Sequence, residues 1–218
     1  MKRRDSLRRR RSFRKPLARF LIVCEGKVTE PVYFDDIRRM ERGIIELEIV
    51  PGSVPKDVVE RAVDMKKQSE RDAKRRQDEN LRYDSVWCVF DIDEHPFVPE
   101  AKQQAHANAI NLAVSNPCFE LWFLLHFQDQ TAHIDRHKVQ HMCRQHMPGY
   151  QKEPPCDVLR PHQVEATERA IQLENWQESR ENAGSTFRTR RHISTGRRCN
   201  TCVVSICQAT KRSLPVTF

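Results

Sequence analysis

The chain has 218 residues, 38% hydrophobic and 31% charged, which is enough for one domain with a hydrophobic core and too few for two domains of ordinary size. No apolar run approaches the roughly 18 residues of a membrane-spanning helix, and the segment MKRRDSLRRRRSFRKP lacks the apolar core of a secretory signal. These absences lead us to expect a cytoplasmic protein with no membrane partner. The formal net charge of +8 favours an anionic partner.

The first half of the chain is predicted to alternate strands and helices. Residues 17–24, LARFLIVC, form a short continuous apolar run, which is typical of a strand buried on both faces. A Thr-Glu-Pro sequence marks the start of a helix over 29–41, because Thr can cap a helix and Pro is tolerated in its first turn. Residues 44–50 are predicted to form a second strand, and residues 56–79 a helix whose second half is almost wholly charged.

The second half continues the alternation. Residues 84–90, DSVWCVF, predict a third buried strand, followed by a helix over 99–110 and a short fourth strand at 112–115. An apolar helix over 117–127 and a last helix over 161–179 complete the pattern. This order predicts an α/β layered fold, with a mostly parallel four-stranded sheet flanked by helices and a C-terminal helical extension. Ligands are then expected at the carboxyl ends of the strands.

Charge divides the chain into three parts. Residues 1–15 hold nine basic residues and one acid, and residues 185–218 hold seven basic residues and no acid, so positions 16–184 carry 22 basic and 29 acidic residues. We predict a flexible basic arm over 1–15, a domain over 16–182 and a basic, cysteine-containing tail over 183–218. The arm either contacts nucleic-acid phosphates or serves as a solubilising tail. Its candidate contact residues are Arg8, Arg9, Arg10, Arg11, Arg14 and Lys15.

Three acids follow predicted buried strands. Glu25 comes after the first strand, and Asp91 and Asp93 come after the third, where in extended backbone they project to the same side. Adjacent carboxylates repel one another and raise each other's pKa unless a cation neutralises them. Mg²⁺ is held by such oxygen ligands together with water and substrate phosphate. The alternative is a turn in which the two aspartates cap the following segment.

Other polar residues are candidates for the same site. Glu30 either supports the site or stabilises a helix start through the helix dipole, and Lys27 either meets a phosphate or lies exposed. Asn116 follows the fourth strand. Glu120 lies in an apolar segment, where an acid is costly unless it reaches a metal, a base or an arginine. His126 is expected in the core.

Histidines and cysteines near the C-terminal end give weaker zinc patterns. Residues 131–160 are predicted to contain a helix and a loop, with His133, His137 and His141 on one helical face. We favour a solvated helix over a zinc site, because no fourth ligand is evident. The tail pair Cys199 and Cys202 has zinc-like spacing, but no function is assigned to the tail.

Three segments, FLIVCEGKVTEPVYF, VWCVFDIDEHP and SNPCFELWFLLHF, resemble the RloB family of prokaryotic defence and restriction-associated loci, whose members have a TOPRIM-type fold. The resemblance covers about residues 12–182 and is expected to end near Gly184. It implies that Glu25 acts as a general acid or base or as a metal ligand, and that Asp91 and Asp93 bind Mg²⁺ or Mn²⁺. Gly26 is expected to allow a tight turn beneath the substrate. The resemblance also implies a partner, an ATPase of the RloA type.

Three functions are compatible with these features. The first is an Mg²⁺-dependent nuclease that acts with the ATPase in anti-phage defence. The second is a non-catalytic module that binds nucleic acid or nucleotide. The third is nucleotidyl transfer, which the sequence supports less because it shows no separate zinc-binding or polymerase region. The choice between DNA and RNA is open, because arginine and lysine contacts to phosphate carry no base information, and a homodimer is also compatible with the sequence.

Overall fold

A four-stranded parallel sheet forms the centre of the computed structural model, which describes residues 17–40, 44–50, 54–92 and 97–184. The strand order is β2-β1-β3-β4, and all three pairings are parallel, so the predicted α/β fold with a mostly parallel sheet is confirmed. The strands are β1 (Arg19–Cys24), β2 (Ile44–Ile49), β3 (Ser85–Asp91) and β4 (Asn111–Ser115).

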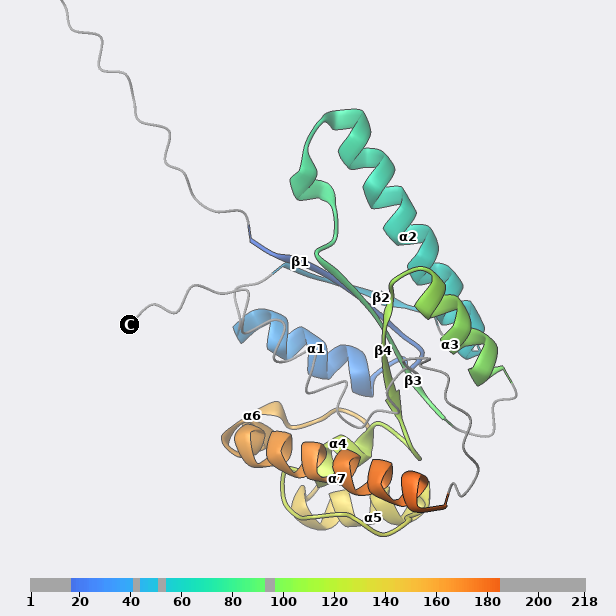
Figure 1. Cartoon of the computed structure of the whole chain (residues 1–218). Coiled ribbons are helices and arrows are strands. Elements are labelled where there is room, and N and C mark those ends of the chain that lie inside the picture. The colour runs from blue at the N-terminus through green and yellow to red at the C-terminus, as the bar shows by residue number, and fades with distance from the viewer. Residues whose placement is uncertain (1–16, 41–43, 51–53, 93–96, 185–218) are drawn as a thin grey trace, which may run out of the picture.

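Helices cover both faces of this sheet (Figure 1). One face carries α2 (Pro55–Arg76) and α3 (Val98–Ala107). The other face carries α1 (Thr29–Met40) and the C-terminal helices. The C-terminal helices are α4 (Glu120–Leu124), α5 (Arg136–His146), α6 (Cys156–Leu159) and α7 (Gln163–Gly184), with the short 3-10 helix η2 (Arg160–His162) between α6 and α7. Another short 3-10 helix, η1 (Glu79–Leu81), follows α2.

Successive side chains of a strand point to opposite faces of the sheet, so each face has its own hydrophobic core. In β1, Leu21 and Val23 belong to the core with α2, whereas Phe20 and Ile22 belong to the core on the other face. That second core is rich in aromatic side chains from α1 and the segment around α4. All four side chains are buried, as expected for a parallel strand covered on both faces. The charge-rich second half of α2 extends past the sheet towards η1 (Figure 1). No helix within the described ranges is long and apolar enough to cross a membrane.

The region after β4 differs from the prediction in detail. The helix predicted over 117–127 is α-helical only in α4, because tighter turns precede and follow it: Trp122 N donates to Phe119 O and Phe127 N donates to Leu124 O. The predicted histidine face is wrong. The N-cap Asp135 starts α5 after His133, so that histidine lies outside the helix.

Candidate functional site

The carboxyl edge of the sheet brings together acids that are distant in sequence. In the register of β1 and β3, Cys24 lies opposite Val89, and the backbone N–H of Glu25 donates to the Val89 carbonyl at 3.1 Å. Glu25 therefore lies beside the end of β3, where Asp91 is the last residue. Both residues line a cavity of about 370 Å³ together with Glu30 and Glu120. The predicted convergence of Glu25 and Asp91 at this edge agrees with the structure.

Glu30 lines this cavity and is buried, although its sequence position also fits an exposed acid at a helix start. It occupies the first turn of α1, yet only 6% of the residue is exposed. Its carboxylate lies directly over Gly26, so that a Cβ on Gly26 would overlap Glu30 Oε2 and Cδ. The φ of Gly26 is outside the left-handed region. Gly26 therefore leaves room for the Glu30 carboxylate, and its backbone conformation is one that other residues also adopt.

Replacing this glycine tests the contact. We expect Gly26→Ala to move the Glu30 carboxylate out of the cavity, because the obstructing atoms are the end of a flexible side chain. At pH 5 the free energy of unfolding should change by less than about 1 kcal/mol, because a carboxyl with a pKa of about 7 is almost wholly protonated there and gains little by reaching solvent. NMR titration of the glutamate carboxyls should show the pKa of Glu30, about 7 in the parent, return towards its ordinary value.

A second glycine provides the control for this variant. Gly149 has φ +84°, and no atom of the described residues lies within 4 Å of the position that a Cβ would take. Gly149→Ala should therefore cost about 1 kcal/mol through backbone strain alone and leave the pKa of Glu30 at about 7. An unchanged Glu30 titration in Gly26→Ala would contradict the steric contact.

Asp91 has an incomplete set of partners. Arg136 Nη2, from the start of α5, donates to Asp91 Oδ2 at 3.1 Å. The other oxygen, Oδ1, is buried and has no hydrogen-bond partner within the part of the chain that the structure describes. The turn-capping alternative concerns residues 93–96, which lie outside the described residues, and the described contact of Asp91 is to a side chain 45 residues away. A shielded carboxylate oxygen without a donor favours a cation ligand.

Glu120 is held by neutral groups among the described residues. Only 8% of the residue is exposed at the start of α4. Its Oε1 accepts a hydrogen bond from Gln140 Nε2 at 3.1 Å, and the Tyr150 hydroxyl lies 3.5 Å from the same oxygen. These bonds orient the carboxylate without neutralising it. Four acids and three basic residues, Lys27, Arg136 and Lys152, line the described part of the cavity.

The electrostatics of the cavity reflect this excess of acid. The pKa of Glu30 is raised from 4.5 to about 7, first by burial and then by the neighbouring Glu120 and Glu25, against the opposing effects of a backbone hydrogen bond and of Arg136. Burial likewise raises the pKa of Asp91 well above its ordinary value, with Glu30 adding to the effect and Arg136 opposing it. Protons or cations must supply the missing positive charge.

The donor chemistry of the cavity fits a hard divalent cation. Carboxylate oxygens are the preferred ligands of Mg²⁺, which is commonly bound through one or two carboxylates, water and substrate phosphate. Across residues 17–40, 44–50, 54–92 and 97–184, no group of three or more His, Cys, Asp or Glu side chains is placed to hold a metal ion by itself. A site built on Asp91, with Glu25 or Glu30 as the second carboxylate, agrees with both observations.

The other predicted residues fall into three groups. Lys27 lines the cavity that contains the four acids, which we call the carboxylate cavity, and so does Lys152. Asn116 lines a neighbouring cavity with Leu121 and Trp176 instead. Asp93 and the basic arm lie outside the described residues, and so does the cysteine tail.

His126 lies in the core, as expected, with 1% exposed. Its Nδ1 lies 2.9 Å from the Trp122 carbonyl, and burial lowers the pKa of the imidazole to about 4. The ring is therefore neutral at neutral pH. Cys24, Cys88 and Cys118 are buried free thiols.

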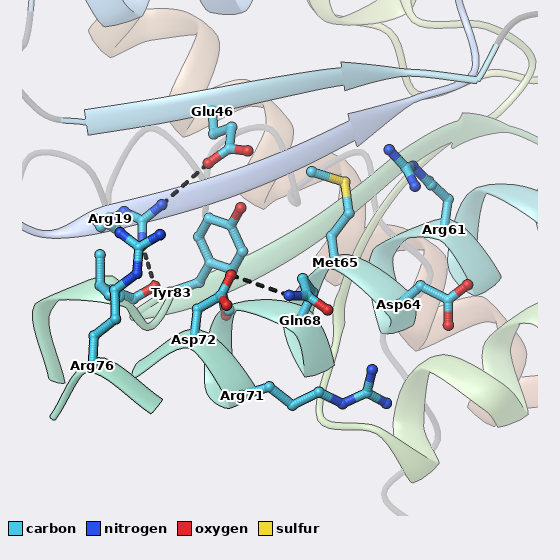
Figure 2. Close-up of a pocket in the computed structure, with 12 residues that line it drawn as sticks. Arg19, Glu46, Arg61, Asp64, Met65, Gln68, Arg71, Asp72, Arg76 and Tyr83 are labelled. Carbon is cyan, nitrogen blue, oxygen red and sulfur yellow. Dashed lines mark hydrogen bonds and ion pairs between the residues drawn. The ribbon is translucent and has the colours of Figure 1, made fainter. Parts of the chain in front are cut away.

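A larger cavity, of about 560 Å³, lies towards the amino end of β1, between the sheet and the second half of α2 (Figure 2). Several of its charges are already paired. Arg19 contacts Glu46 at 3.2 Å and lies over the ring of Tyr83, 4.7 Å from its centre. Arg61 contacts Glu48 at 2.7 Å. Four arginines and three acids line this cavity, whereas four acids and three basic residues line the one around Asp91.

Comparison with known proteins agrees with the resemblance seen in the sequence. A comparison with curated proteins finds no match. The family model described as RloB-like protein matches residues 20–196, which is most of the chain and includes every acid of the carboxylate cavity. This match extends past Gly184, where the resemblance was expected to end. The chain belongs to the family of RloB-like proteins.

Proposed function

We propose that this chain is a divalent-cation-dependent nuclease that cleaves phosphodiester bonds in nucleic acid and acts with an RloA-type ATPase in prokaryotic anti-phage defence. The observation that carries the proposal is the buried Oδ1 of Asp91 at the strand end, which lacks a hydrogen-bond partner among the described residues. It lies in a cavity that also contains Glu25, Glu30 and Glu120. Such a cavity attracts a cation and then, through that cation, a phosphate.

Each residue has a defined part in this proposal. Asp91 supplies the principal oxygen ligand for Mg²⁺ or Mn²⁺, and Asp93 would add a second from the adjoining segment. Glu25, beside Asp91 at the same edge, accepts a proton from the attacking water or completes the ligand set. A bound divalent cation supplies Lewis-acid polarisation of the phosphoryl oxygen and a lowered pKa of bound water.

Basic residues complete the substrate site in this proposal. Lys27 and Lys152 line the cavity that contains the four acids and would contact the phosphates on either side of the scissile bond. The arm over residues 1–15, with nine basic residues, would retain the nucleic acid through phosphate contacts. Binding and bond cleavage would then depend on different parts of the chain.

A cleavage panel tests the proposal. The purified full-length chain is incubated with plasmid, linear duplex DNA, single-stranded DNA and tRNA, with Mg²⁺, Mn²⁺ or EDTA, and with and without the ATPase partner. We expect cleavage of at least one substrate with a divalent cation and none with EDTA. Salt-sensitive binding without cleavage on every substrate would instead favour the non-catalytic module, and product growth that requires nucleoside triphosphates would favour nucleotidyl transfer.

A further inference from the structure

Arg136 is a charged residue of the carboxylate cavity that the sequence did not reveal. It is the first residue of α5, directly after the N-cap Asp135, whose side chain accepts a hydrogen bond from the Lys138 N–H at 3.0 Å. This cap fixes where the helix begins and therefore where the arginine emerges. From that position the guanidinium reaches the end of β3 and donates to Asp91 Oδ2 at 3.1 Å.

The guanidinium provides positive charge to more than one acid. It opposes the rise in the pKa of both Asp91 and Glu30, although burial and the neighbouring acids outweigh it in each case. Four carboxylates line the cavity that this guanidinium enters. Compensation is incomplete, because Asp91 Oδ1 still lacks a hydrogen bond within the described residues.

Arginine and a divalent cation cannot both occupy the space beside Asp91 without repulsion. At a separation of a few Å, two like charges near a protein surface oppose each other by several kcal/mol before screening. A cation that binds Asp91 therefore favours withdrawal of the guanidinium. Arg136 carries a long side chain that is 36% exposed, so solvent is within its reach when it leaves Asp91.

We propose that Arg136 is a built-in counter-ion that competes with the divalent cation for Asp91, and that the guanidinium released from Asp91 binds the non-bridging oxygens of the substrate phosphate. This inference rests on the proposed nuclease function, whose metal site it shares. A planar guanidinium can bind two phosphate oxygens at once, a geometry that a lysine ammonium lacks. The same side chain then stabilises the empty site and the substrate complex at different stages.

Opposite changes in metal affinity and in turnover distinguish this role from a structural one. In Arg136→Gln, Mn²⁺ affinity measured by calorimetry without nucleic acid should increase about ten-fold, because a partly screened like charge has been removed. Cleavage at saturating Mn²⁺ should fall about 100-fold, the usual effect of removing a donor to a developing charge. Arg136→Lys should keep nearly the parent Mn²⁺ affinity and still lose turnover.

Arg144→Gln is the matched control, since Arg144 is exposed on the same helix and the substitution removes the same charge. Arg144→Gln should change neither the Mn²⁺ affinity nor the cleavage rate appreciably. Thermal unfolding checks that each variant is folded. If Arg136→Gln does not fold, the Mn²⁺ affinity and turnover of Arg136→Lys test the inference instead. Unchanged or weaker Mn²⁺ binding by Arg136→Gln, in a protein whose parent cleaves, would overturn this inference alone. A parent that neither binds Mn²⁺ nor cleaves would overturn both this inference and the proposed function.

Discussion

An Asp91→Asn variant is expected to lose at least about 100-fold of the divalent-cation-dependent cleavage rate while remaining folded. The amide keeps the size of the side chain but removes the charge that a hard cation requires. The fold should tolerate the change, because burial raises the pKa of Asp91 and the ionised form is already costly there. The rate is measured on the substrate that the parent cleaves best, with circular dichroism as the check of folding.

Asp84→Asn provides the control for this substitution. Asp84 lies just before the opposite end of β3, is exposed, and accepts a hydrogen bond from the Arg19 N–H at 2.7 Å. An asparagine can accept the same bond, so cleavage should be nearly unchanged. Full activity in Asp91→Asn, or equal losses in the two variants, would be incompatible with a metal ligand at the strand end.

A Glu30→Gln variant is expected to be more stable than the parent by an amount that depends on pH. The pKa of Glu30 is raised from 4.5 to about 7 in the folded protein, so the folded state binds this proton more tightly than the unfolded state. The resulting stability is fully present below about pH 4.5 and is lost as pH rises through 7. Glu30→Gln removes this dependence. Without metal it should raise the free energy of unfolding by about 3 kcal/mol at pH 8 and by only about 1 kcal/mol at pH 5.

Urea unfolding of parent and variant at the two pH values measures this difference. Glu165→Gln is the matched control, because Glu165 also lies in the first turn of a helix but is exposed. The control should show no pH-dependent gain. Added Mg²⁺ should narrow the gap between parent and Glu30→Gln, since a bound cation compensates the ionised carboxylate. A gain that is equal at pH 5 and pH 8 would exclude a raised pKa as its cause.

The strands and their order could be predicted from the sequence because parallel strands buried on both faces appear as continuous apolar runs. The meeting of Glu25 with Asp91 followed from the same pattern, since the carboxyl ends of parallel strands share one edge. Glu30 was harder to place. Its first-turn position also satisfies the helix dipole, and its contact with Gly26 appears only once the turn between β1 and α1 is built.

The contribution of α5 could not be predicted in this way. Residues 131–160 lack a clear hydrophobic periodicity, so neither the start of α5 at the Asp135 cap nor its packing against α4 was evident. The contact between Arg136 and Asp91 depends on both. The bonds from Gln140 and Tyr150 to Glu120 likewise join segments whose relative position is set by tertiary packing.

The central claim is that the carboxyl edge of the sheet binds a divalent cation through Asp91. Its most direct test is Mn²⁺ binding to the purified full-length chain and to Asp91→Asn, measured by electron paramagnetic resonance without nucleic acid. We predict saturable binding by the parent and at least about ten-fold weaker binding by the variant, because a charged ligand has been lost. Equal Mn²⁺ affinity in the two proteins would contradict the claim.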